Sequence, residues 1–76
     1  MNPMFHIRKT VLKMSQRELA AISGVTQTTV SRWEAGALEP SRDEMEKIRA
    51  EARRRRVKWN DRLFFEIPTE QAGATS

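Results

Sequence analysis

The sequence predicts an all-α protein, a compact bundle of four or five short helices. Apolar residues recur at spacings of three and four, which is the period of an amphipathic helix. Two Ser-x-x-Glu capping boxes, Ser15 to Glu18 and Ser41 to Glu44, mark helix beginnings. Gly24 and Gly36 follow periodic stretches, at places where a helix commonly ends.

The first helix is expected to begin at Asn2 and Pro3, because asparagine is a good N-cap and proline suits the first helical position. His6 lies beside the apolar stripe, so we expect a surface or half-buried ring, and no second metal ligand is nearby. The stripe, which predicts a face buried in the core, consists of Met4, Ile7, Val11 and Met14.

The second helix should begin after the cap Ser15 and end at Gly24. Thr26 is a suitable cap for a third helix through about Ala35, which Gly36 ends. The apolar positions of the second helix are Leu19, Ala20 and Ile22. A fourth helix should run from the cap Ser41 to about Arg55, with the stripe Met45, Ile48 and Ala52.

The segment 57–67 has two interpretations. Asn60 could cap a short helix through Phe65, or the segment could be an edge strand ended by Pro68. We favour the helix. Residues 68–76 have no periodicity and no bulky apolar group, so we expect a disordered tail after a folded domain of residues 1–67.

Size and composition narrow the possible functions. A chain of 76 residues is one domain of marginal stability, because folding at this size buries only about 60% of the surface, so self-association is plausible. Without cysteine there are no disulfides or thiolate sites, and no apolar run is long enough for a membrane span. We expect a soluble, cytoplasmic protein with no membrane partner.

Catalytic chemistry is poorly represented. The chain has one histidine and no glycine-rich phosphate loop, and it offers no nucleophile and base pair. The neighbouring carboxylates Asp43, Glu44 and Glu46 suit the first turn of a helix, where the dipole favours acids. The sequence therefore predicts no enzyme, and no cofactor, metal or small-molecule substrate.

The third helix has a polar side that is unusual in its residue types. At about 100° per residue, Val30 and Trp33 fall on one side of this helix, and Gln27, Thr28, Ser31 and Arg32 fall on the other. We call these last four residues the polar edge. A merely solvated side is usually filled with Lys and Glu, which are better helix formers than Thr and Ser. Such a surface suits base edges in a DNA major groove, where glutamine pairs with adenine, arginine with guanine, and a threonine methyl meets a thymine methyl.

The surrounding spacing adds a stronger signal. Residues 16–35, QRELAAISGVTQTTVSRWEA, closely resemble the helix-turn-helix of the phage repressor and Cro family, the xenobiotic-response-element type of bacterial regulator. The resemblance covers about residues 7–50 and implies a lambda-repressor-like fold. The matching positions are Gln16, Leu19, Ala20, Gly24, Val25, Val30, Glu34 and Gly36. Two features depart from the family: many members have glycine where this chain has Lys13, and the loop 37–39 lacks the basic residues that others use on phosphate.

The resemblance also implies roles for individual residues. The resemblance implies that the partner is double-stranded DNA. It also implies that Gln16 can brace Gln27 and that Lys9 can pair with Glu34. The implied base-reading residues are Thr26, Gln27, Thr28 and Arg32. The implied phosphate contacts are Lys9, Ser15, Gln16, Thr29, Ser31 and Arg42, the last expected in the loop before the fourth helix.

Positive charge is concentrated in one part of the chain. The net charge is +4, yet eight basic and only two acidic residues lie between Lys47 and Arg62. Arg53 to Arg56 could clamp DNA, but four consecutive helical residues point in widely different directions. Cations at a helix C-terminus are also stabilising without any ligand. We therefore favour a solvated or partner-facing end over a clamp.

The C-terminal segment carries more apolar surface than it can bury by itself. Some of these side chains should seal the core, and the rest could form a dimer interface, as the segment after the fourth helix commonly does in this family. The candidates are Trp59, Leu63, Phe64 and Phe65.

The leading hypothesis is a sequence-specific transcriptional regulator, a phage- or plasmid-type repressor that binds a palindromic operator as a homodimer. A second is an antitoxin-like or co-regulator subunit that binds a partner protein through its aromatic end. A third is sequence-independent binding of nucleic acid through the basic segment.

Overall fold

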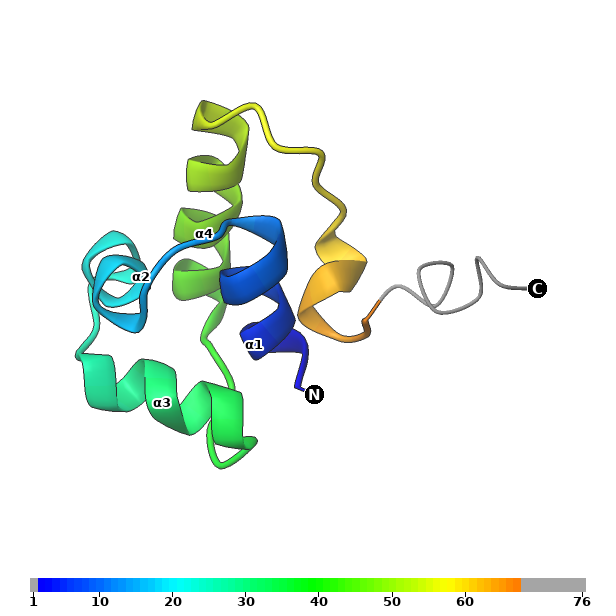
Figure 1. Ribbon diagram of the computed structural model, residues 1–76. Helices are drawn as coiled ribbons and strands as arrows, with labels where there is room; N and C mark the ends of the chain where they lie inside the picture. Colours follow the sequence, from blue (N-terminus) through cyan, green and yellow to red (C-terminus); the bar gives the residue numbers. More distant parts are fainter. Residues whose placement is uncertain (1, 68–76) are drawn as a thin grey trace.

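The computed structural model describes residues 2–67, which fold into six helical segments and contain no strand. The prediction of an all-α bundle is confirmed. The segments are α1 (Pro3–His6), the π-helical turn η1 (Ile7–Val11), α2 (Gln16–Ser23), α3 (Gln27–Ala35), α4 (Arg42–Arg54) and the 3₁₀ turn η2 (Asp61–Phe64). In Figure 1, α3 runs along the lower edge of the bundle, with the other helices above it. α2 packs against α3 and α4, and α1 packs against α3 and η2.

The first helix begins as predicted and ends earlier than predicted. The Asn2 side chain caps α1 by accepting a hydrogen bond from the Met4 amide at 2.8 Å. The helix continues through the wider turn η1 and stops at Val11. Lys13 then adopts a left-handed conformation with φ of 53°, and the Met14 amide donates back to the Arg8 carbonyl at 3.0 Å. Met14 therefore reaches the core from a loop, although the apolar spacing placed it on the helix.

The predicted caps of the next three helices are present. Both Ser-x-x-Glu boxes form, one before α2 and one before α4. Gly24 and Gly36 end α2 and α3 with φ of 74° and 78°, in the region that only glycine adopts without strain. Arg42 is the first residue of α4, so its expected place in the preceding loop was wrong.

The core lies where α1, α2, α3 and α4 meet, and it contains most of the predicted stripes. Trp33, Ile7, Leu19, Ile48 and Val30 are the largest fully buried apolar side chains. Burial stabilises each of them by roughly 1.5–3 kcal/mol, so Val30 and Trp33 hold α3 firmly by one side.

His6 is buried, with 3% of its surface exposed, and the expectation of a surface or half-buried ring was wrong. Because α1 lies between α3 and η2, more of its circumference is covered than the single apolar stripe requires. Among residues 2–67, the His6 Nε2 atom has no hydrogen-bond partner.

The segment after α4 is helical, as favoured, but forms only one 3₁₀ turn. The Asn60 side chain caps η2 by accepting from the Arg62 amide at 2.8 Å. Leu63 is buried against the core, and Trp59 packs edge-on against Phe64 with ring centroids 5.2 Å apart. The predicted disordered tail, residues 68–76, lies outside the described residues.

Candidate nucleic-acid interface

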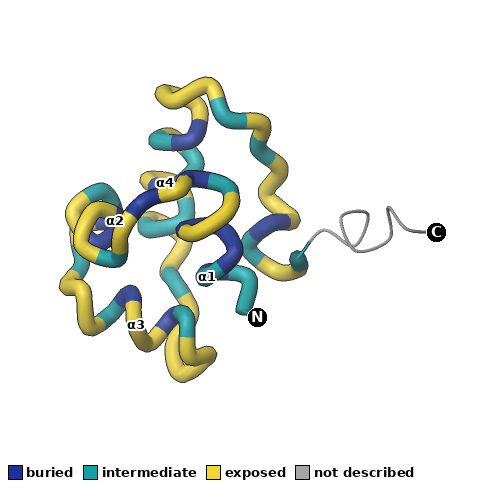
Figure 2. The backbone as a smooth tube through the Cα atoms, viewed as in Figure 1, coloured by how far each residue is buried: buried dark blue, intermediate teal, exposed yellow. Residues whose placement is uncertain are grey.

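The polar edge is exposed along the whole of α3. Gln27, Thr28, Ser31 and Arg32 are all exposed, and Val30 and Trp33 on the opposite side are buried. Figure 2 shows this alternation as buried and half-buried stretches between exposed ones along α3. Because α3 lies at the edge of the bundle, no other described element covers this row of side chains. The edge is therefore free to enter a groove.

The beginning of α3 is fixed by its own threonines. The Thr26 hydroxyl accepts a hydrogen bond from the Thr29 amide at 3.1 Å and lies 3.0 Å from the Thr29 hydroxyl. Thr26 is exposed, and Thr29 is half-buried. Both hydroxyls retain hydrogen-bonding capacity for an outside group, because each can donate and accept. This end of the helix also carries the positive end of the dipole, which favours a phosphate.

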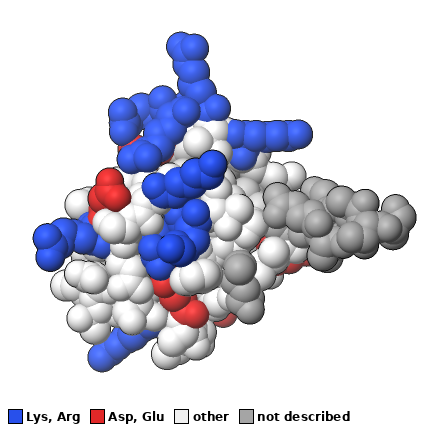
Figure 3. All heavy atoms as spheres, in the orientation of Figure 1, with Lys and Arg blue, Asp and Glu red and all other residues white. Residues whose placement is uncertain are grey.

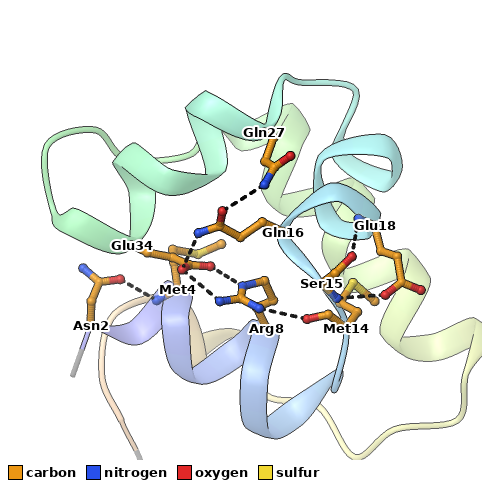
Figure 4. A network of polar contacts seen from close by, with 9 residues as sticks. All are labelled: Asn2, Met4, Arg8, Met14, Ser15, Gln16, Glu18, Gln27 and Glu34. Carbon is orange, nitrogen blue, oxygen red and sulfur yellow. Dashed lines mark hydrogen bonds and ion pairs between the residues drawn. The ribbon is translucent and has the colours of Figure 1, made fainter.

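A chain of polar contacts connects the polar edge to the interior (Figure 4). Arg8 forms a two-point ion pair with Glu34: its Nε contacts Oε2, and its Nη2 lies 3.1 Å from Oε1. Gln16 donates from Nε2 to Glu34 Oε1 at 3.0 Å, and Gln27 donates from Nε2 to Gln16 Oε1 at 3.3 Å. The contact expected between the two glutamines is thus present, and it continues into a buried ion pair.

The partner of Glu34 is Arg8, and the expected pairing with Lys9 was wrong. Arg8 follows Met4 by four residues, so it borders the buried stripe, whereas Lys9 points away and is exposed. The same helical period therefore contains the signal that identifies Arg8. Arg8 also donates from Nη1 to the Met14 carbonyl at 3.0 Å, which holds the loop after η1.

The remaining candidates for phosphate contact fall into two places. Lys9 and Ser15 line one shallow hollow beside the start of α2. Ser15 is exposed, and its hydroxyl accepts from the Glu18 amide at 3.0 Å. Arg42 is exposed and lines a different hollow, next to Phe64 and Phe65. Only the first group lies close in sequence and space to Gln16.

Two of the basic residues at the end of α4 form ion pairs within the protein. Glu51 pairs with Arg54 and, at 2.6 Å, with Arg55. Hydrogen bonds from Arg54 and then Arg55 lower the pKa of Glu51 from 4.5 to about 2. Figure 3 shows basic side chains gathered over this end of the molecule, whereas the surface around α3 is largely uncharged. The basic run at the end of α4 thus lies apart from the polar edge, whose one charged residue is Arg32.

The aromatic end supplies an exposed apolar surface. Leu63 is buried within the monomer, and Trp59 and Phe64 are half-buried. Phe65 is 72% exposed and Leu38 is 45% exposed, the two large apolar side chains so placed among the described residues. Both line a hollow together with Met45 and Phe64. We call Leu38, Met45, Phe64 and Phe65 the apolar patch.

Residues 2–67 contain no group of three or more His, Asp or Glu side chains that could hold a metal ion. Within the same range, no helix is long and apolar enough to cross a membrane.

The model of the family described as helix-turn-helix matches residues 7–50. This match covers more than half of the 76 residues and includes α2, α3 and most of α4. Comparison with curated proteins found no match, and comparison with solved structures found none.

Proposed function

Because the chain belongs to the helix-turn-helix family of Cro/C1 type, it is a DNA-binding transcriptional regulator, and we propose that it is a homodimeric repressor of a palindromic operator. The family is a DNA-binding one and not an enzyme family. In this proposal, α3 enters the major groove. Thr26, Gln27, Thr28 and Arg32 read bases, and dimerisation uses the apolar patch.

The observation that supports direct readout is the exposed polar edge, held rigidly by the buried side of the same helix. Gln27 offers an amide that can pair with two atoms of adenine, and Arg32 offers a planar fork suited to guanine O6 and N7. Thr28 offers a methyl for thymine. A helix with these groups on its outer side discriminates bases, because each base pair presents a distinct pattern in the major groove.

Phosphate contacts would set the register of α3 on the duplex. The Lys9 ammonium, the Ser15 hydroxyl and the exposed part of Gln16 lie beside the start of α2, next to the polar edge. Thr29 and Ser31 contribute from α3, and Arg42 contributes from the start of α4. These groups add affinity for any sequence, whereas the base-reading residues add preference.

The small footprint of one α3 supports a homodimer. A single reading helix contacts too few base pairs to select one site in a genome, and two copies about 10 base pairs apart supply the missing specificity. The apolar patch favours self-association because it exposes the apolar side chains of Phe65 and Leu38 to solvent. Leu38 places this patch next to the C-terminal end of α3. Repression is the simplest action for such a dimer, because occupancy of a promoter is sufficient to exclude polymerase.

Selection of binding sites from random-sequence duplexes tests this proposal. We expect one enriched motif with two inverted half-sites, about 10 base pairs from centre to centre. Replacing Arg32 or Gln27 by alanine should cost about 1–3 kcal/mol on that duplex and leave binding to random duplex unchanged. Equal losses on both duplexes would contradict direct readout.

The apolar patch also favours a second candidate, a subunit that binds a different protein. Sedimentation equilibrium of the wild type and of Phe65→Ser separates the two. A concentration-dependent dimer that the substitution weakens supports the homodimer. A monomer that is unaffected by the substitution, and that associates only with a foreign protein, supports the second candidate.

A further inference from the structure

The carboxylate of Glu34 forms an ion pair with Arg8 and also accepts a hydrogen bond from Gln16. Its side chain is 8% exposed, and its two oxygens accept hydrogen bonds from Arg8 and from Gln16. A carboxylate can only accept hydrogen bonds, and the Arg8 guanidinium beside it donates to both of its oxygens. Any group that hydrogen-bonds to Glu34 must therefore present a donor.

This requirement fixes the orientation of the Gln16 amide. Gln16 turns its NH₂ group toward Glu34 at 3.0 Å, so its carbonyl oxygen points the other way, toward Gln27. A carbonyl oxygen can only accept, and Gln27 donates one N–H to it at 3.3 Å. One buried charge thus sets the direction of two successive amides (Figure 4).

We propose that Glu34 is a specificity-determining positioning residue, which acts through Gln16 to make Gln27 present one donor and one acceptor to the DNA. With one N–H occupied by Gln16, Gln27 retains a second N–H and its carbonyl oxygen. That pair matches N7 and N6–H of adenine. The inference rests on the proposed function, because it assumes that Gln27 contacts a base.

The opposite orientation would select a different base. If Gln16 turned its NH₂ group outward, Gln27 would have to offer its carbonyl oxygen to Gln16 and direct both N–H groups to the DNA. Two donors match O6 and N7 of guanine. The substitution Glu34→Gln permits this reversal, because a carboxamide at position 34 can donate to Gln16 as well as accept from it.

The experiment measures the ratio of affinities for two duplexes. Selection with the wild type and with Gln27→Ala first locates the base pair that depends on Gln27, which should contain adenine. Two duplexes that carry A·T or G·C at this pair are then titrated with each variant. In Glu34→Gln, the adenine-to-guanine ratio should fall by about tenfold relative to the wild type. Gln16→Ala should also lower the ratio, because it removes the link between Glu34 and Gln27.

The matched control is Arg8→Lys, which keeps a cation beside Glu34 and removes the two-point pairing. This variant should lose stability, as Glu34→Gln does, and should keep the wild-type ratio. Loss of folded protein lowers both affinities equally and cancels in the ratio, so a purely structural role of Glu34 would leave the ratio unchanged.

Three results would overturn the inference: an unchanged ratio in Glu34→Gln, an equal fall in Arg8→Lys, or a base other than adenine at the pair that depends on Gln27. In each case base readout by Gln27 would stand. If Gln27→Ala altered no position of the motif, the proposed contact between Gln27 and DNA would itself be wrong, and the inference would fall with it.

Discussion

The helix-turn-helix unit and the C-terminal end of α4 differ in the residues that end their helices and in the side chains that they expose. α2 and α3 end at the left-handed glycines Gly24 and Gly36, whereas α4 is followed by Arg56 at φ of 57°. The α3 edge carries short hydrogen-bonding side chains and little charge, whereas the α4 end carries a run of arginines, two of which pair with Glu51. The helix-turn-helix unit is therefore the less charged of the two.

The basic run and the polar edge therefore offer DNA two different kinds of contact, one through charge and one through directed hydrogen bonds. A basic run attracts any polyanion, but exposed long side chains at a helix end take no fixed position. Preference for a sequence requires donors and acceptors held in a known direction. The buried side of α3 and the hydrogen bonds from Glu34 through Gln16 to Gln27 are suited to hold them. Substitutions in both regions should therefore have unequal effects.

The largest expected difference concerns added negative charge. Thr28→Glu should weaken binding to the selected duplex by several kcal/mol, because it places a carboxylate against the acceptor-rich groove. Glutamate is favourable in the first turn of α3, so the fold should be retained. Arg53→Glu changes the charge by twice as much and should cost about 1 kcal/mol or less. Fluorescence anisotropy with both variants checks this, and a larger loss for Arg53→Glu would reverse the comparison.

The second difference concerns the left-handed positions. Gly36→Ala should destabilise the fold by about 1–2 kcal/mol, because an L-residue is strained at this φ, while its Cβ would meet only Asn2 Nδ2 at 3.8 Å. Arg56→Gly and Lys13→Gly should each stabilise by up to about 1 kcal/mol, since both native residues already carry that strain. Urea unfolding measures all three. Equal destabilisation by all three would show that backbone conformation does not decide these positions.

A smaller difference should appear in the salt dependence of DNA binding. Lys9→Gln should lower the slope of log K against log salt by about 1, the value expected for one lost phosphate contact. Arg54→Gln should lower it by less, because Glu51 already pairs with this arginine. Titrations on random duplex at several salt concentrations provide the slopes. A full unit lost in Arg54→Gln alone would assign the phosphate contact to the basic run.

The smallest effect concerns acid. The pKa of Glu51 is lowered to about 2, so the stability that it contributes is present above its usual pKa of 4.5 and is lost as the pH falls through about 2. The melting temperatures of the wild type and of Glu51→Gln should therefore differ at neutral pH and converge between pH 4.5 and 2. A difference that persists at pH 2 would show that the pairing of Glu51 with Arg54 and Arg55 is not its source.

The helices could be predicted because their signals are local. Ser15, Thr26 and Ser41 cap their own helices, and Gly24 and Gly36 end theirs, so neighbouring residues determine each boundary. The exposed side of α3 followed from its period alone.

Features that depend on packing between helices were harder to predict. The burial of His6 depends on how α3 and η2 enclose α1. The choice of Arg8 over Lys9 as the partner of Glu34 had a local signal, because Arg8 follows Met4 by four residues and so borders the buried stripe. The early end of the first helix could be predicted in part. Many members of the family have glycine at the position of Lys13, and glycine favours the left-handed conformation that Lys13 adopts. The molecule that would cover the apolar patch could not be predicted, because the sequence of one chain does not identify what binds there.

A double-mutant cycle between Arg32 and the DNA tests most directly whether the polar edge of α3 discriminates base pairs. The wild type and Arg32→Ala are titrated on the selected duplex and on duplexes with each G·C pair of a half-site changed to A·T. We predict a coupling free energy of about 1–3 kcal/mol at one G·C pair and none at the others. Coupling near zero at every pair would contradict the claim.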